Sequence, residues 1–344
     1  MLIYCVQFVF VLFSCLKRSK VLDYSVLLLL MIVLAFRDSS VGTDTINYLD
    51  MLYSWNYEVE IAMDSSGKQM EYIWTNFVDL VYKLGLSSDY LVIIPGLVNV
   101  FLIYYSFRRF KINVNVALLF FVIMTYYFLA FNILRQTLAV SITLLAYSFA
   151  IEKNYYKYFI AMFFAVGVHF SSAICLPIIL LNWLNSNLKL YIPLLIISLV
   201  LGLSGFDLYF LKSYSFYDSY SDLVSAEAGV TSIRVFIRIF MTLFSIYAIK
   251  QKRVDNVFIV NLFVLANIID NMCLRVDPII YRISFYFSII YPVFLSKYFE
   301  SYKIKLQANV IFYLFVLVYF VNFMYSLILN SGEIVPYSFN KSFF

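Results

Sequence analysis

Apolar runs recur along almost the whole chain, and they limit its possible folds more than any other feature. Each has roughly the 15 to 25 residues that a helix needs to cross the apolar core of a bilayer. Because lipid offers the backbone no hydrogen-bond partners, each run is expected to be helical. The sequence predicts an all-α, polytopic integral membrane protein with about 10 to 11 transmembrane helices. The candidate spans are 2–16, 22–36, 89–107, 114–131, 133–151, 158–182, 190–205, 233–249, 256–271, 278–296 and 307–329.

Composition excludes several classes of protein. Of 344 residues, 63% are hydrophobic and 13% are charged, whereas soluble domains carry about 25% charged residues. A nucleic-acid-binding protein, a disordered regulator and a soluble enzyme are therefore excluded. No P-loop, GxSxG, HExxH or Rossmann glycine pattern occurs, so we expect no cofactor. The cysteines have no metal-ligand spacing and are interpreted as inert thiols, with no metal site: Cys5, Cys15, Cys175 and Cys273.

Two longer polar stretches, 37–88 and 206–232, interrupt a chain that we interpret as a single transmembrane domain, 1–344. Basic clusters indicate the topology, because cytoplasmic loops are enriched in Lys and Arg. If all the clusters are cytoplasmic, both long stretches and the C-terminus are extracytoplasmic. The clusters are Lys17, Arg18 and Lys20; Arg108, Arg109 and Lys111; Lys153 and Lys157; Lys250, Lys252 and Arg253; and Lys297, Lys303 and Lys305.

This topology requires an odd number of crossings between Lys157 and the stretch 206–232, but two candidate spans lie there. One of them is therefore expected to be re-entrant. Run 158–182 is the better candidate, because Gly167, His169 and Pro177 interrupt it. Irregular backbone at membrane depth is tolerated only where protein buries it or where it lines a watery cavity.

Arginines outside the basic clusters lie at the expected outer ends of spans. In one interpretation they extend to the lipid headgroups or pair with Asp38, Asp270 and Asp277. In the other they form an extracytoplasmic cationic pocket, since Arg binds phosphate oxygens through two parallel hydrogen bonds. Both interpretations stay open. The arginines are Arg37, Arg135, Arg234, Arg238, Arg275 and Arg282.

Three further side chains are candidates for acid–base chemistry, each with a structural alternative. His169, the only histidine, is either a general base or a packing residue. Asp44 is either a catalytic carboxylate or a helix cap within Thr43–Asp44–Thr45. Glu71 opens an amphipathic aromatic stretch, 70–84, that is expected to lie along the outer membrane surface. Its alternative is an exposed glutamate in a first helical turn.

The second polar stretch, 206–232, carries acidic and tyrosine side chains together. Such a surface can stack on sugar rings and bond their hydroxyls, but interfacial tyrosine belts have the same composition. Sugar binding there is one of two open interpretations. The residues are Asp207, Tyr209, Tyr214, Tyr217, Asp218, Tyr220, Asp222 and Glu227.

Five segments in order resemble the EpsG family, which looks related to the Wzy polymerases of O-antigen and capsule synthesis. They are FRDSSVGTDTINY (36–48), the pair Glu71–Tyr72, FNILRQTLAVSI (131–142), FAVGVHFSSAICLP (164–177) and YRISFYF (281–287). The resemblance extends from about residue 30 to 290. Family members often have a glycine between the loop glutamate and its aromatic, whereas Glu71 is followed directly by Tyr72.

The resemblance implies a glycosyltransferase-type polymerase. It would join polyprenyl-diphosphate-linked oligosaccharide repeat units into O-antigen, capsular or exopolysaccharide at the outer face of the bacterial cytoplasmic membrane. Arg135 and Arg282, helped by Arg37 or Arg275, would hold the diphosphate. His169 is the first choice for the base.

Glu71 and Asp44 are the second choices for the base. The matching motifs add supporting residues, which are Gly42, Thr43, Tyr48, Asn132 and Gln136.

The expected partners are the lipid-linked oligosaccharide, the bilayer, a chain-length regulator and a flippase, and no nucleic acid. Three other functions stay open. A flippase for the same lipid would share the cationic cavity, but it often shows internal repeats, and none is evident. A polysaccharide ligase shares the donor chemistry. A membrane O-acyltransferase fits one intramembrane histidine and leaves the Gly-Thr-Asp and Arg-Gln segments unexplained.

Overall fold

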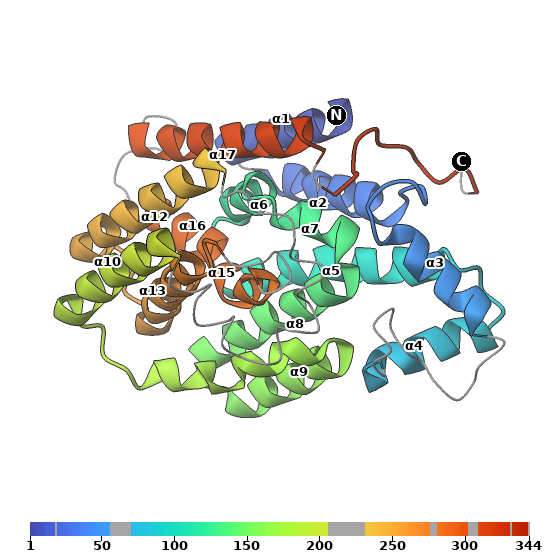
Figure 1. Cartoon of the computed structure of the whole chain (residues 1–344), viewed down its shortest axis with the longest axis horizontal. Helices are drawn as coiled ribbons and strands as arrows, with labels where there is room; N and C mark the ends of the chain where they lie inside the picture. Colours follow the sequence, from blue (N-terminus) through green and yellow to red (C-terminus); the bar gives the residue numbers. More distant parts are fainter. Residues whose placement is uncertain are drawn as a thin grey trace. The chain divides into compact units, whose positions relative to one another are not determined.

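The computed structural model describes residues 1–17, 19–55, 70–205, 231–275, 281–301, 309–330 and 332–342. Helices make up nearly all of the regular structure in these ranges, and one isolated antiparallel bridge joins Arg37 to Phe339 (Figure 1). This confirms the all-α, polytopic membrane class. The chain divides into two compact units, the first formed by Met1–Leu176 with Tyr302–Phe344 and the second by Pro177–Ser301.

The first unit contains both chain ends and most of the motifs singled out above. The polar stretch 37–88 contributes two of its helices, α3 and α4, and α4 lies within the stretch 70–84 that was expected to be amphipathic. The helices of the first unit are α1 (Leu2–Leu16), α2 (Lys20–Ala35), α3 (Thr45–Ser54), α4 (Tyr72–Lys83), α5 (Tyr90–Arg109), α6 (Val114–Ile123), α7 (Tyr126–Asn132), α8 (Leu134–Ile151), α9 (Tyr155–Val168) and α17 (Val310–Ile328).

Helix α8 is central to the first unit, since it packs against α5, α7 and α9. Helix α2 packs on α5, and α1 packs on α2 and α6, while α17 covers α6. Aromatic side chains fill the space between them, and many are fully buried, among them Phe120, Tyr127, Phe131 and Tyr147. Phe120 contacts Phe312 and Phe315 of α17 edge to face, which attaches this late helix to the core.

The basic ends of the helices in the first unit lie on one side. Arg109, at the end of α5, pairs with Glu152 directly after α8. Asn115, in the first turn of α6, donates to Asp23 in the first turn of α2, at 2.7 Å. The opposite ends of α8 and α9 carry Arg135 and His169. The structure therefore places these two residues on the side of the unit away from the basic clusters.

Two apolar runs of the first unit are broken. Helices α6 and α7 meet at 57°, where Thr125 adopts a left-handed conformation. The run 158–182 is interrupted at His169, whose backbone is extended (φ −156°, ψ 115°) between α9 and the 3₁₀ helix η1 (Phe170–Asn182). The expected irregularity in this run is thus present, and its re-entrant path stays a prediction.

The second unit is arranged around one helix, α13, which packs against α10, α12, α15 and α16. Asn271 of α13 donates to Ser198 of α10 and Thr242 of α12, at 3.1 and 3.0 Å. Gly202 permits the close approach of α10, because any added Cβ would overlap the Asn271 carbonyl. The helices are α10 (Leu188–Ser204), α12 (Ser232–Gln251), α13 (Val257–Met272), η4 (Arg282–Ser284), α15 (Phe285–Ser288) and α16 (Tyr291–Glu300).

In the described ranges, four helices are long and apolar enough to cross a membrane, or five if the bent α6–α7 pair is one span. The four are α5, α8, α12 and α17, and the shorter apolar helices are α1, α9, η1, α10 and α13. The expected span 278–296 begins outside the described residues and continues as η4, α15 and α16. The total of about 10 to 11 crossings therefore stays a prediction.

One arginine of the second unit has a carboxylate partner. Arg238 of α12 forms an ion pair with Asp270 of α13, and the Tyr291 hydroxyl donates to the same carboxylate oxygen at 2.8 Å. Asp270 is buried. This pairing agrees with the interpretation of Arg238 as a structural residue. Another possible partner in that interpretation, Asp277, lies outside the described residues.

Replacing Arg238 by Met should destabilise the protein strongly, because it leaves the carboxylate of Asp270 buried without its counter-charge. Loss of one partner from such a pair costs about 3–5 kcal/mol. The double variant Arg238→Met, Asp270→Leu should recover most of the loss, which thermal unfolding of the purified protein in detergent would measure. Equal melting temperatures for wild type and Arg238→Met would contradict the assignment.

Candidate functional site

Three segments far apart in the sequence meet at the carboxylate of Glu71. One oxygen, Oε1, lies 3.0 Å from His169 Nδ1 and accepts the backbone N–H of Phe170 at 2.8 Å. The other, Oε2, lies 3.4 Å from a guanidinium nitrogen of Arg135. The side chain of Glu71 is 16% exposed. The structure thus brings together three of the residues singled out in the sequence.

Glu71 is held as a carboxylate. Burial raises its pKa, but the hydrogen bond with His169, the charge of Arg135 and the Phe170 N–H lower it further, and the net pKa is below that of an ordinary glutamate. The stability that Glu71 contributes is therefore present above the pKa of an unfolded glutamate. It is lost as pH falls through the lower pKa of the folded state. A carboxylate with a lowered pKa is a weak base, which favours an orienting role.

His169 is oriented by this carboxylate. An ionised carboxylate only accepts hydrogen bonds, so Nδ1 of His169 must donate. The neutral imidazole then carries its lone pair on Nε2, the nitrogen that can take a proton from a substrate. The ring is partly exposed, and the extended backbone of His169 ends α9 at this point. A general base oriented by a carboxylate would require this geometry.

Arg135 lies in the first turn of α8, where the positive end of the helix dipole adds to its own charge. Its backbone N–H donates to the Tyr48 hydroxyl at 3.3 Å. The ring of Tyr48 packs edge to face on Trp74 of α4, with centroids 5.7 Å apart. These contacts fix the start of α8 relative to α3, which begins after Asp44, and to α4, which begins after Glu71. Gln136, the next residue of α8, is buried.

The Gly-Thr-Asp segment holds the end of α7, three residues before Arg135. Thr43 donates to the Asn132 side-chain oxygen through its backbone N–H, at 2.9 Å, and its hydroxyl, at 3.2 Å. Gly42 has φ +92°, and an added Cβ would overlap the Phe131 carbonyl, so only glycine fits. Asp44 precedes α3 and accepts from the Thr43 hydroxyl at 3.0 Å. It occupies the N-cap position of α3, but its side chain makes no capping hydrogen bond there, and its catalytic role stays a prediction.

Arg37 is buried, with 2% of its surface exposed. Its guanidinium donates to the Leu34 carbonyl at 2.6 Å and the Thr45 hydroxyl at 3.0 Å, and it lies 5.3 Å from the Phe131 ring centre. Burial lowers its pKa to about 10, so it stays charged at neutral pH. A direct contact between Arg37 and a diphosphate stays a prediction, and the geometry favours a positioning role.

The other predicted phosphate contacts belong to the second unit. Arg282 opens η4, and Arg275 is an exposed residue shortly after α13. Arg234 is engaged within that unit, since it donates to the Cys273 carbonyl at 3.0 Å and lies 4.2 Å from the Tyr281 ring centre. The structure does not relate these arginines to the Glu71 cluster, and their contacts with substrate stay predictions.

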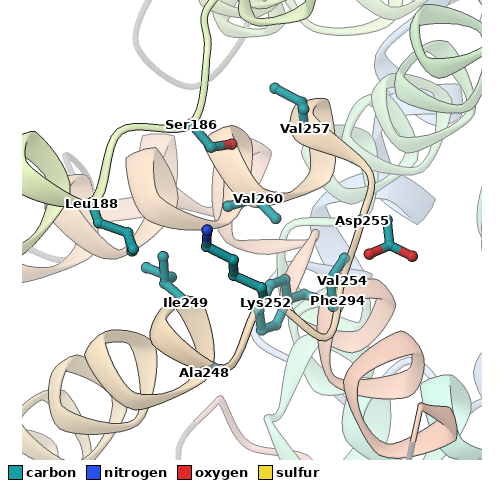
Figure 2. A pocket seen from close by; sticks show the side chains of 10 residues that line it. All are labelled: Ser186, Leu188, Ala248, Ile249, Lys252, Val254, Asp255, Val257, Val260 and Phe294. Atoms are coloured by element: carbon teal, nitrogen blue, oxygen red, sulfur yellow. The ribbon is translucent and has the colours of Figure 1, made fainter.

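A cavity of about 290 Å³ lies in the second unit, beside the end of α12 (Figure 2). Its walls are mostly apolar, and Lys252 extends between Ser186 and Ile249, whereas Asp255 points away. Lys252 belongs to one of the basic clusters expected in the cytoplasm. The described lining has no histidine paired with a carboxylate, so this cavity is a poorer candidate than the Glu71 cluster.

The helical fold and the Glu71 cluster define a polytopic membrane protein with a histidine–carboxylate pair beside an arginine. The family comparison gives this class a name. The chain matches the EpsG family over residues 20–339 and belongs to that family. No curated protein and no solved structure matches it. EpsG family members are Wzy-like polymerases, so membership indicates a polymerase-type enzyme of polysaccharide biosynthesis.

One contributor to the site has no sequence signal of its own, and the packing role of another, Gly167, was not evident from its place in run 158–182. The Phe170 N–H binds Glu71 through the backbone, which no residue type reports. Gly167 allows α4 to pack on the end of α9: an added Cβ would lie 2.5 Å from Ile73 Cδ1 and 2.6 Å from Cγ1. Ile73 is two residues after Glu71, and Gly167 is two residues before His169. This contact therefore helps to set the distance between Glu71 and His169.

Replacing Gly167 by Ala should reduce polymerisation, because the new methyl displaces Ile73 and separates Glu71 from His169. Shortening Ile73 to Ala in the same chain should restore most of the activity by vacating the space. The measurement is surface-polysaccharide chain length at equal protein levels in the membrane. Ile73→Ala alone is the control. If the double variant is no better than Gly167→Ala, the steric explanation is wrong.

Proposed function

We propose that this protein polymerises oligosaccharide repeat units carried on polyprenyl diphosphate, at the outer face of the bacterial cytoplasmic membrane. The observation that carries the proposal is the convergence of His169, Glu71 and Arg135 in a membrane protein of the EpsG family. The cluster lies on the side of the first unit opposite its basic helix ends, which is the outer side by the positive-inside rule.

The reaction is a displacement at the anomeric carbon of the donor sugar. Nε2 of His169 takes the proton of the acceptor hydroxyl as the acceptor oxygen bonds to that carbon. The bond from the anomeric carbon to the diphosphate oxygen breaks, and the diphosphate leaves with the electron pair. Direct displacement inverts the anomeric centre. Energy comes from the glycosyl diphosphate bond, so no nucleotide is consumed.

Glu71 and Arg135 have different tasks in this scheme. Glu71 fixes the His169 tautomer and stabilises the imidazolium that forms during transfer. Arg135, at the positive end of α8, binds the departing diphosphate and offsets its growing charge. Arg282 and Arg275 are proposed as further diphosphate contacts. A chain-length regulator and a flippase are proposed partners, and O-antigen, capsule and exopolysaccharide are the proposed products.

The size profile of surface polysaccharide tests the proposal. A strain lacking this protein, and one carrying His169→Gln, should both lose long chains but keep single-unit product, because export and ligation are intact. Loss of a general base lowers rate by about 10² to 10⁴-fold. Complete loss of surface product with accumulation of lipid-linked units inside would instead identify a flippase.

Arg135→Lys separates charge from geometry. Lysine keeps the positive charge but loses the planar pair of donors. Polymerisation should fall by on the order of 100-fold, as when one donor of an oxyanion site is removed. Arg109→Lys is the matched control, because Arg109 pairs with Glu152 at the opposite end of the unit and should retain activity. Unimpaired chain growth in Arg135→Lys would exclude the two-donor clamp.

A further inference from the structure

A cleft of about 920 Å³ opens in the first unit, apart from the Glu71 cluster. Its walls are one face of α3, the connection between α4 and α5, and two short segments, 38–39 and 340–342. Sites for small molecules commonly measure about 300–1,000 Å³. The cleft therefore has the volume of a binding site, and nothing in the proposed catalytic chemistry uses it.

The walls of the cleft are held by hydrogen bonds between segments that are distant in sequence. Asn340 donates its side-chain N–H to Asp89 at 2.7 Å and its backbone N–H to the Phe36 carbonyl at 3.0 Å. The backbone N–H of Asp38 donates to the Ser338 carbonyl at 3.0 Å. Within the connection between α4 and α5, the Ser87 hydroxyl donates a hydrogen bond to Asp89 at 3.1 Å. The cleft is thus formed before any ligand enters, which reduces the entropy lost on binding.

Two tyrosines present their rings at the cleft. Tyr53 of α3 is 73% exposed and Tyr82 of α4 is 40% exposed, and both line it. Large aromatic side chains gain by covering an apolar surface, and their π faces attract weakly positive C–H groups. The C–H face of a sugar ring offers such a surface. Carboxylate oxygens can accept hydrogen bonds from sugar hydroxyls, and Asp38 and Asp50 are also in the lining.

The charge of the described lining disfavours anionic ligands. Among the described residues that line the cleft are three aspartates and one lysine, Lys341, so their net charge is negative. A diphosphate or an anionic lipid headgroup would be repelled. Across the described part of the chain, no group of three His, Cys, Asp or Glu side chains is arranged to hold a metal ion. An uncharged saccharide is the ligand that satisfies both the rings and the carboxylates.

Helices α3 and α4 lead from the catalytic cluster to this cleft. Tyr48 of α3 binds the backbone of Arg135, and Tyr53 lies further along the same helix. Glu71 immediately precedes α4, and Tyr82 is near its end. Twelve helical residues extend over about 18 Å. A ligand reaching from the reacting sugar to the cleft would therefore be several sugar residues long.

We propose that this cleft is a saccharide-binding subsite that holds a sugar segment remote from the reacting bond. The inference rests on the proposed polymerase function, and it adds a second point of attachment for the glycan. A chain held at two points stays bound between additions, since the second contact is intramolecular. The subsite therefore favours long products over release after a few additions.

Binding of lipid-free oligosaccharide tests the subsite directly. The probes are the single repeat unit and a several-unit fragment released from the polysaccharide of the producing strain, titrated calorimetrically into full-length protein in nanodiscs. Tyr53→Leu with Tyr82→Leu should weaken binding by about tenfold or more, because the aromatic faces are lost. Tyr53→Phe with Tyr82→Phe should bind within about threefold of wild type, since the rings remain.

The matched control is Tyr156→Ala. Tyr156 is an exposed tyrosine at the start of α9, and its variant should bind as wild type. Equal affinity of the double Leu variant and wild type, at matching thermal stability, would overturn the inference, as would absence of binding to wild type. Tight binding of either probe that is lost in the Leu variant supports it. If only the longer fragment binds, the occupant is the growing chain.

The catalytic variant separates the two proposals. His169→Gln should bind the oligosaccharide normally while failing to polymerise, and the double Leu variant should polymerise but yield chains several-fold shorter. Normal polymerisation by His169→Gln, with binding lost in the Leu variant, would refute the catalytic assignment and leave the subsite standing. Full-length product from the Leu variant would overturn the proposed link between the cleft and chain length.

Discussion

The carboxylate of Glu71 is the contact on which the candidate site depends. It offsets the charge of Arg135, accepts the Phe170 N–H and fixes which nitrogen of His169 carries the proton. Each of these groups belongs to a different helix end, so the same side chain also joins α4, α8 and α9. An unpaired charge that is this little exposed is costly. One ionised group therefore both joins these helices and orients the candidate base.

Irregular backbone surrounds this carboxylate on two sides. Helix α7 ends at Asn132, α8 begins two residues later, and α9 ends in the extended backbone of His169. A continuous helix at membrane depth satisfies its own backbone and presents few groups to a substrate. Broken helices are tolerated where protein or a watery cavity receives the free groups. Here the Thr43 and Glu71 contacts satisfy part of that requirement.

Residue chemistry was predictable from the sequence, but residue proximity was not. Arg135 and His169 were recognisable because charge and imidazole are rare in apolar runs, and Glu71 because it opens an amphipathic stretch. The burial of Arg37 was not predictable, since a span end looks the same whether protein or water covers it. The contact between Gly167 and Ile73 depends on how two helices cross. Sugar binding by 206–232 was one of two open interpretations, and residues 206–230 lie outside the described ranges. The cleft instead combines segments that have no distinctive sequence pattern.

The segment 332–342 contributes to the site from the far end of the sequence. The Glu333 carbonyl accepts the N–H of Gly42, the Ile334 carbonyl accepts the Tyr4 hydroxyl, and Phe339 bridges to Arg37. The loop that holds the junction before Arg135 is thus completed by a segment that is far from it in the sequence. Contacts of such long sequence separation carry a loop-closure entropy cost, so they form late in folding. The helices can therefore pack before this loop reaches its final conformation.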